Sequence, residues 1–327
     1  MEAVALFGSQ VSGGSDNNSD RDLLVVCPPN EKQLKIREFT TAGYGVSAYT
    51  PQQLEYMKDK GSLFLQHLKY ESKILHDNNG NFEKFLKSCT LIPPSDLEIA
   101  KTVNTILYVL AAPRTGSLSL WLEDYLYVLS RDFLIKYFAK RGKVVFNVNH
   151  LSESMANEFN ISNNEVVAFG RLRHGKYLYR NGFSAINHST ISLQRWTDAI
   201  IRITDCKKTN VLSKNNYLNY HADNSFISNY HLLRYIESLR ILFPTVAHET
   251  TNDKKLELLI KNPNQYSSTS ANSVRYLKDY LKIFRKKANK FLHNPSDYRS
   301  TFVEAYAEAH FDMLSQDVIY PSSAGEV

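Results

Sequence analysis

The sequence predicts a mixed α/β fold, with an N-terminal mixed β-sheet and its helices followed by an all-α region. In the N-terminal part, short apolar runs alternate with clusters of Gly, Ser, Asp and Asn, which is typical of strands joined by loops. After Pro93-Pro94, long segments carry apolar residues at helical spacing. The chain of 327 residues is long enough for two domains. We expect domains at 1–92 and 93–327, the second divisible into helical subdomains at 93–185 and 186–327.

The predicted sheet region begins with a strand, a polar loop and a second strand. The first strand covers residues 4–7, and the second, at 20–26, begins with two aspartates before its apolar run. Thr50 is a helix N-cap, because Pro51 suits the first helical position. Further helices are expected at 31–41, 51–57 and 63–71, and strands at 44–49 and 73–77.

The remainder of the chain is predicted to be helical. Apolar faces of helical period indicate helices at 96–112, 118–140, 163–179, 191–206, 229–243, 254–261, 274–292 and 301–314. The Ser/Thr-rich segment 266–272 is expected to be mobile, and residues 320–327 to form a loose tail.

The start of the second strand carries the first candidate site residues. Side chains alternate faces along a strand, so Asp20 and Asp22 project to one side about 7 Å apart, while Arg21 points the other way. Mg²⁺ is usually held by one or two carboxylates together with the phosphates of a substrate. Asp20 and Asp22 are therefore candidate metal ligands.

The end of the first strand carries the second candidate pair. At Gly8 the backbone can approach a ligand closely, and Ser9 adds a hydroxyl beside free N–H groups, which suits a phosphate. The alternative is an ordinary turn, because Gly, Ser, Asn and Asp dominate turns for conformational reasons. Together the two pairs predict a cradle for a metal-bound triphosphate.

The combined pattern is more specific than either half. Gly8-Ser9, ten intervening residues, then Asp20-x-Asp22 followed by Leu-Leu-Val-Val resembles the signature of the DNA polymerase beta-type nucleotidyltransferase superfamily. The spacing is most similar to the minimal nucleotidyltransferases, relatives of the antibiotic nucleotidyltransferases. The resemblance covers about the first 90 residues, and the helical remainder is only generally similar to the helical domains of this group.

The resemblance implies a Mg²⁺-dependent (or Mn²⁺-dependent) transferase. Asp20 and Asp22 are then catalytic and metal-binding, and Gly8 and Ser9 bind the nucleotide. The substrate is an NTP, with ATP favoured, and an acceptor hydroxyl attacks the α-phosphate with release of pyrophosphate. The acceptor is a small molecule, an RNA end or a partner protein, and the sequence does not choose among them.

The sequence departs from the family at the third strand. The resembling enzymes carry a third carboxylate there, in the slot that holds Ser47 here, and a serine is a poor base at neutral pH. Three interpretations stay open: a base from the helical domain, sufficiency of two acids, or nucleotide binding without turnover. The last describes a degenerate sensor or partner-binding module, for example in a prokaryotic toxin–antitoxin or defence system.

Within the helical region, Glu123 and Asp124 are the first candidates for a replacement base, because they lie amid apolar residues that raise carboxyl pKa values. The alternative for both is a salt bridge to Arg131 or to a neighbouring helix. His67, a lone histidine on a predicted helix, is more often packed or solvated than in contact with substrate.

Two predicted helices are dense in cations. Helix 163–179 and the residue after it bring Arg171, Arg173, His174, Lys176 and Arg180, which suit a triphosphate tail or an RNA backbone; a solvated face is the alternative. Helix 274–292 clusters lysines and arginines and is the best candidate surface for nucleic acid.

Composition narrows the class of protein. The formal net charge of +6 suits a polyanionic partner. Three widely separated cysteines, without a C-x-x-C pair, favour a reducing compartment and argue against zinc. No apolar run is long enough to span a membrane and no secretion signal is present. We expect a cytoplasmic protein with no membrane partner.

Overall fold

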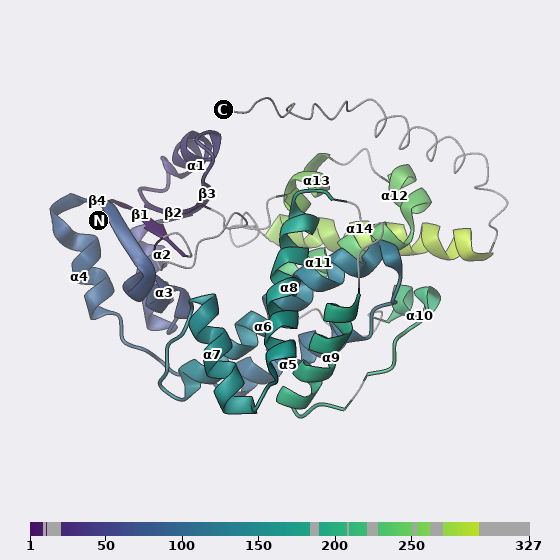
Figure 1. The fold of residues 1–327 in the computed structure, drawn as a ribbon. Coiled ribbons are helices and arrows are strands. Elements are labelled where there is room, and N and C mark those ends of the chain that lie inside the picture. The colour runs from purple at the N-terminus through teal and green to yellow at the C-terminus, as the bar shows by residue number, and fades with distance from the viewer. Residues whose placement is uncertain are drawn as a thin grey trace, which may run out of the picture. The chain divides into compact units, whose positions relative to one another are not determined.

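The protein has a mixed α/β fold that is predominantly helical and contains a small four-stranded sheet (Figure 1). The computed structural model describes residues 1–8, 11, 21–183, 190–207, 209–220, 228–250, 254–261 and 271–293. The chain divides into two compact units, Met1–Ser213 and Lys214–Val327. This division lies later in the chain than the domain boundary expected near residue 92. That boundary falls inside the first unit and stays a prediction. None of the described helices is long and apolar enough to cross a membrane.

The sheet has the strand order β3-β2-β1-β4. Its strands are β1 (Ala3–Phe7), β2 (Asp22–Val26), β3 (Gly45–Tyr49) and β4 (Ser72–Asp77). The central pair β1 and β2 is antiparallel, as is β1 with β4, whereas β2 and β3 run parallel. The predicted strand-loop-strand and the third and fourth predicted strands are all present, and the sheet is mixed as expected.

Helices cover both faces of this sheet. The helices are α1 (Lys32–Thr41), α2 (Pro51–Asp59), α3 (Leu63–Glu71) and α4 (Asn81–Ser88), the last preceded by the 3-10 turn η1 (Asn78–Gly80). Phe7 and Leu24 belong to a core shared with α2, α3 and α4, whereas Leu23 and Val25 pack with Ile36 of α1. Figure 1 shows α1 on one side of the strands and α2 with α3 on the other.

Local signals set the ends of these elements. Thr50 caps α2 as predicted: its hydroxyl accepts from the Gln53 backbone N–H at 3.2 Å, while the side-chain Oε1 of Gln53 accepts from the Thr50 backbone N–H at 2.9 Å. The end of α3 is bound to the end of β1, because the Gly8 N–H donates to the Glu71 carbonyl at 3.3 Å. That bond fixes α3 beside the edge of the sheet where Asp22 lies.

The helical part of the first unit surrounds one buried helix, α6. Its members are α5 (Asp96–Leu110), η2 (Gly116–Leu118), α6 (Ser119–Lys140), α7 (Val148–Phe159), α8 (Asn163–Arg180) and α9 (Ile191–Ile203). Helix α6 is buried on most sides, as expected for a helix packed by α5, α8 and α9. Where α8 approaches α6, Gly175 faces Glu123, which is 1% exposed.

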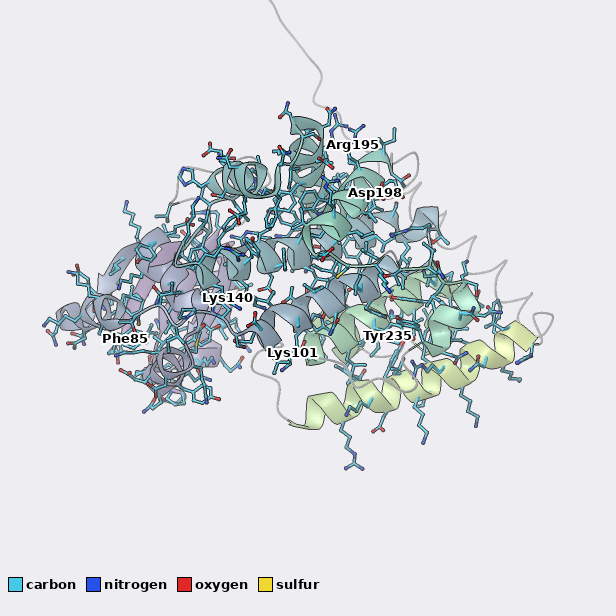
Figure 2. All side chains as sticks on the ribbon, turned by 90° about the horizontal axis from the view of Figure 1, so that it is seen from below. Phe85, Lys101, Lys140, Arg195, Asp198 and Tyr235 are labelled. Atoms are coloured by element: carbon cyan, nitrogen blue, oxygen red, sulfur yellow. The ribbon has the colours of Figure 1, made fainter. Side chains whose placement is uncertain are left out.

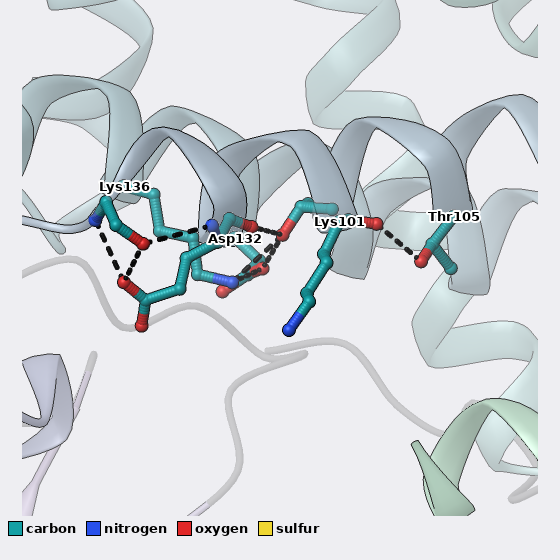
Figure 3. A network of polar contacts seen from close by, with 7 residues as sticks. Lys101, Thr105, Asp132 and Lys136 are labelled. Atoms are coloured by element: carbon teal, nitrogen blue, oxygen red, sulfur yellow. Dashed lines mark hydrogen bonds and ion pairs between the residues drawn. The ribbon is translucent and has the colours of Figure 1, made fainter. Parts of the chain in front are cut away.

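Polar side chains join α5 to α6 (Figure 3). The Thr102 hydroxyl donates to Asp132 at 2.9 Å, and the Lys136 ammonium donates to both residues, at 2.9 and 2.6 Å. At the start of α5, hydrogen bonds from the Ser95 hydroxyl and backbone N–H lower the pKa of the Glu98 carboxyl. Lys140, labelled in Figure 2, is the last residue of α6 and forms an ion pair with Asp96 at this start of α5.

The described residues of the second unit form helices and short connections, with no strand. It contains α10 (Lys214–Asn219), α11 (Asn229–Leu242), α12 (Pro244–Thr250), α13 (Lys254–Lys261) and α14 (Ala271–His293). The hydroxyl of Tyr235, labelled in Figure 2, lies 2.8 Å from the Leu218 carbonyl, to which Arg285 also donates at 2.9 Å. These bonds hold the end of α10 against α11 and α14, and burial raises the pKa of Tyr235.

The predicted helices within the described residues are confirmed, with ends that differ by a few residues. The sequence analysis missed α4, α7, α10 and α12. Helices α10 and α12 have six and seven residues, which is too few for a clear apolar period, whereas the helical spacing of Phe82, Phe85 and Leu86 in α4 and of Leu151 and Met155 in α7 was overlooked. The helix predicted at 301–314, the tail at 320–327 and most of segment 266–272 lie outside the described residues.

Gly175→Ala is expected to destabilise the first unit. A Cβ at this position would lie 2.8 Å from the Cβ and 2.9 Å from the Cδ of Glu123, so α8 would have to move away from α6. We expect a loss of about 2 kcal/mol in the free energy of unfolding, measured by urea denaturation.

Gly170→Ala is the matched control in the same helix. A Cβ there meets nothing within 4 Å, so the change should be neutral or stabilise the protein by up to about 1 kcal/mol. Equal effects of the two substitutions would contradict the close-packing argument.

Candidate functional site

Asp22 is the first residue of the inner strand β2 and lies between Gly8 and Gly45. We call this end of the sheet the sheet corner. In the strand register Asp22 pairs with Phe7 of β1 and with Gly45 of β3. A Cβ on Gly8 would lie 3.4 Å from one carboxylate oxygen of Asp22, and a Cβ on Gly45 would lie 3.1 Å from the other. Gly8 also has a φ of +82°, a conformation that side chains disfavour. Glycine at both positions therefore leaves room for the carboxylate.

This corner opens into a pocket of about 340 Å³ within the first unit. One wall is the sheet corner, with Gly8 and Asp22, and the opposite wall is formed by α6 and α8. The pocket is lined by Phe7, Gly8, Asp22, Phe64, His67, Tyr127, Val128, Arg131, Val148, Arg173, Lys176, Tyr177, Arg180 and Asn181. Its volume falls within the range of about 300–1,000 Å³ that small-molecule sites occupy.

The helical wall of the pocket is strongly cationic. Arg173, Lys176 and Arg180 follow one another at spacings of three and four residues, which places them on one face of α8. Arg131 adds a fourth cation from α6 and donates to the Phe146 carbonyl at 2.9 Å. Four cations and one described carboxylate face the same space, which favours a ligand with several negative charges.

Arg180 is held by a buried acid. Its Nε and one terminal nitrogen both lie 3.1 Å from the same carboxylate oxygen of Asp124, which is fully buried, whereas the Arg180 side chain is 27% exposed. A guanidinium held in this way has a fixed position and orientation at the pocket. The ion pair therefore both neutralises Asp124 and positions one cation of the pocket.

Aromatic rings fill the space between the sheet corner and the helices. Phe64 and His67 of α3 both contact Phe7 edge to face, with ring centroids 5.4 and 5.8 Å apart. Tyr127 and Tyr177 line the helical side. These rings give the pocket apolar surfaces beside its charges, as a ligand with a flat apolar part and an anionic part requires.

No family model, curated protein or solved structure matches this chain. The chemistry assigned to the pocket is therefore argued from its own residues.

The structure places two of the four predicted site residues at the pocket. Asp22 and Gly8 line it, although the Gly8 N–H is not free for a phosphate as expected, because it donates to the Glu71 carbonyl. Ser9 and Asp20 lie outside the described residues, so their predicted roles stay predictions. The described strand β2 begins at Asp22, two residues later than predicted.

Ser47 lies on the same face of the sheet as Asp22. It pairs with Leu24, two residues beyond Asp22, and it does not line the pocket. Among the described residues, no group of three or more His, Cys, Asp or Glu side chains is placed to hold a metal. The described residues therefore contain no cluster in which two further acids, histidines or cysteines join Asp22 around a metal ion.

The hypothesis that Glu123 or Asp124 replaces the missing base is not supported. Their exposed fractions are 1% and 0%, and neither residue lines the pocket. The salt-bridge alternative holds for Asp124, although its partner is Arg180 rather than Arg131. The carboxylates face inward because α6 is buried between α5, α8 and α9.

Sequence reasoning missed several residues of the pocket. Arg131 was considered only as a salt-bridge partner, and Tyr127 and Tyr177 were not singled out. The basic run in α8 was noticed, but a solvated face was a competing interpretation. The spacing of Arg173, Lys176 and Arg180 was the available signal, because it places the three on one helix face.

Arg180→Gln is expected to destabilise the protein, because it leaves the fully buried Asp124 carboxylate without this guanidinium. We expect a decrease of about 3 kcal/mol in the free energy of unfolding, measured by guanidinium denaturation at neutral pH. Arg171→Gln, at an exposed position of the same helix, is the control and should change it by less than about 0.5 kcal/mol. A similar loss in both variants would argue against the buried pair.

Proposed function

We propose that the protein is a Mg²⁺-dependent nucleotidyltransferase that moves a nucleoside monophosphate from an NTP, ATP favoured, to an acceptor hydroxyl. One observation carries the proposal: the Gly8–Asp22 corner and the cationic face of α8 line the same pocket. These two features lie about 150 residues apart in the chain and were expected independently to bind phosphates.

Different residues of the pocket would bind different parts of a nucleoside triphosphate. Arg173, Lys176 and Arg180 would bind the phosphate oxygens, and the Gly8 backbone would allow their close approach. The aromatic side chains would receive the nucleoside. Binding energy from these contacts orients the α-phosphate toward the acceptor, which is the main source of rate in phosphoryl-type transfers.

The residues fit a hard divalent cation, Mg²⁺ or Mn²⁺. The Asp22 carboxylate at the pocket is an oxygen donor of the kind Mg²⁺ prefers, and Asp20 is the predicted second ligand. Mg²⁺ commonly uses only one or two protein carboxylates and completes its shell with phosphate and water, so a larger cluster is not required. When bound, the ion would neutralise charge on the phosphates.

The transfer step balances without a further reactant. The acceptor oxygen forms a bond to the α-phosphorus, the bond from that phosphorus to the bridging oxygen breaks, and pyrophosphate leaves. The hydroxyl proton must pass to a base. The acceptor class remains a small molecule, an RNA end or a partner protein.

A second candidate is nucleotide binding without turnover. It is favoured by Ser47, which stands in the sequence where the resembling enzymes carry their third carboxylate and which shares a sheet face with Asp22. Such a protein would sense nucleotide or bind a partner, as in a toxin–antitoxin or defence system. The pocket serves either function, so an assay of turnover separates them.

The test uses purified protein, Mg²⁺, α-labelled NTPs and each acceptor class in turn, with pyrophosphate release as the measurement. We expect release that requires Mg²⁺ and falls at least about 100-fold when Asp20→Ala and Asp22→Ala are combined. Asp59→Ala, at an exposed aspartate of α2, should retain full activity.

Two results would count against the transferase. Binding of Mg²⁺-ATP without pyrophosphate release from any acceptor would favour the sensor. Absence of both binding and release would exclude both candidates.

A further inference from the structure

His67 combines packing against aromatic rings, a hydrogen bond to a carboxylate and a place at the candidate site. It lines the pocket that Asp22 and Gly8 also line. Its Nε2 lies 3.1 Å from a carboxylate oxygen of Glu71, one turn later on α3, and the two side chains are 14% and 15% exposed. The ring stacks on Phe146, with centroids 4.6 Å apart and planes at 29°.

These contacts fix both the position and the tautomer of the ring. A carboxylate accepts only, so the hydrogen bond to Glu71 places a proton on Nε2 and leaves the lone pair on Nδ1. In the part of the chain that the structure describes, Glu71 is the only hydrogen-bond partner of the ring. Arg131 donates a hydrogen bond to the Phe146 carbonyl, and the Gly8 N–H donates one to the Glu71 carbonyl. Phe146 and Glu71, the residues that contact the imidazole, are therefore themselves held in place.

We propose that His67 is the general base of the transfer and that Glu71 positions it. This inference rests on the proposed function. It answers the question left by Ser47, since Glu123 and Asp124 are buried away from the pocket. A base must lie within reach of the reacting hydroxyl and be held by a second group, and in the described pocket His67 meets the second condition.

The step proceeds with one proton transfer. Nδ1 of His67 takes the proton of the acceptor hydroxyl as its oxygen bonds to the α-phosphorus and pyrophosphate leaves. The imidazolium that forms is stabilised by the Glu71 carboxylate and afterwards loses its proton to solvent.

Other charged and titratable groups surround this step. Asp22, Arg131, Arg173, Lys176 and Arg180 line the same pocket, together with Tyr127 and Tyr177. An imidazole must be neutral to act as a base, so a general-base histidine predicts that activity falls as the pH decreases from about 8 to about 5.

The test measures single-turnover pyrophosphate release from Mg²⁺-ATP across this pH range, with the best acceptor found for the wild type. His67→Gln is expected to lower the rate by about 100- to 10,000-fold and to remove the acidic limb of the profile. Glu71→Gln should lower the rate less and move that limb. His76→Gln, at an exposed histidine of β4, is the control and should behave as the wild type.

Binding of a non-hydrolysable Mg²⁺-ATP analogue distinguishes a failure of the His67 proposal from a failure of the proposed function. His67→Gln should bind the analogue with unchanged affinity. Retention of rate and pH profile in this variant, or loss of binding in place of rate, would overturn the proposal while leaving the transferase intact. A wild type that binds the analogue but releases no pyrophosphate would overturn both.

A separate observation concerns the second unit. Exposed cations form one stripe along α14, at Arg275, Lys278, Lys282, Lys286 and Lys290. Their spacing of three or four residues keeps them on one face over about 22 Å. The opposite face packs into the unit through buried side chains, namely Leu277, Tyr280, Leu281, Phe284 and Ala288.

We infer that this stripe binds the phosphate backbone of a nucleic acid. The row of like charges complements a chain of phosphates, and Asp279 is the single exposed acid among the described side chains of α14. A membrane surface is less suited, because a membrane-bound helix inserts its apolar face, whereas that face of α14 is buried in the unit apart from Ile283, which is 55% exposed.

The test is the anisotropy of a short fluorescein-labelled single-stranded RNA at several salt concentrations. Changing Lys278, Lys282, Lys286 and Lys290 to Gln together should weaken binding at least about tenfold and flatten the salt dependence. The control changes Lys60, Lys84, Lys87 and Lys101 to Gln, with the same loss of charge. Equal weakening in both, no RNA binding by the wild type, or stronger binding to phosphatidylserine vesicles than to RNA would overturn the inference.

Discussion

The close approach of α8 to α6 is the constraint on which the candidate site depends. Gly175 lets the backbone of α8 lie over the buried Glu123, and the ion pair between Arg180 and Asp124 fixes the same helix near its end. With α8 held at both points, its cationic face has one orientation and lines the pocket. A displaced α8 would remove Arg173, Lys176 and Arg180 from the pocket and leave Arg131 of α6, so the packing of two helices controls the electrostatics of the site.

That packing concentrates positive charge in a confined space. Arg131, Arg173 and Lys176 are half-buried, so they interact more strongly with a ligand than fully solvated lysines and arginines do. Like charges at such proximity repel one another, and Asp124 offsets part of this cost through Arg180. Cations gathered on one wall of the pocket favour an anionic ligand such as a phosphate over an apolar one.

The sheet corner, with Gly8 and Asp22, supplies the acidic side of the candidate site, which complements the cations of α6 and α8. Two glycines leave room for the Asp22 carboxylate, and the hydrogen bond from Gly8 to Glu71 ties α3 to the same corner. This bond brings His67 of α3 to the pocket. Neither the Asp20-x-Asp22 pattern nor the basic run of α8 pointed to that helix. Under the proposed function, the imidazole of His67, held by Glu71, would accept the proton in place of the third-strand carboxylate of the resembling enzymes, whose position Ser47 takes in the sequence pattern.

Local chemistry in the sequence determined the strand-loop-strand, the capped helix at Thr50, the roles open to Gly8 and Asp22, and the cationic face of α8, because turns, caps and periodicity act within a few residues. Only the tertiary structure decided that α8 and the sheet corner share one pocket, that Glu123 and Asp124 turn inward, and that Glu71 orients His67 within it. These outcomes depend on which helix faces pack together. The packing of residues far apart in the chain is set by shape and volume across the whole unit, which no short segment records.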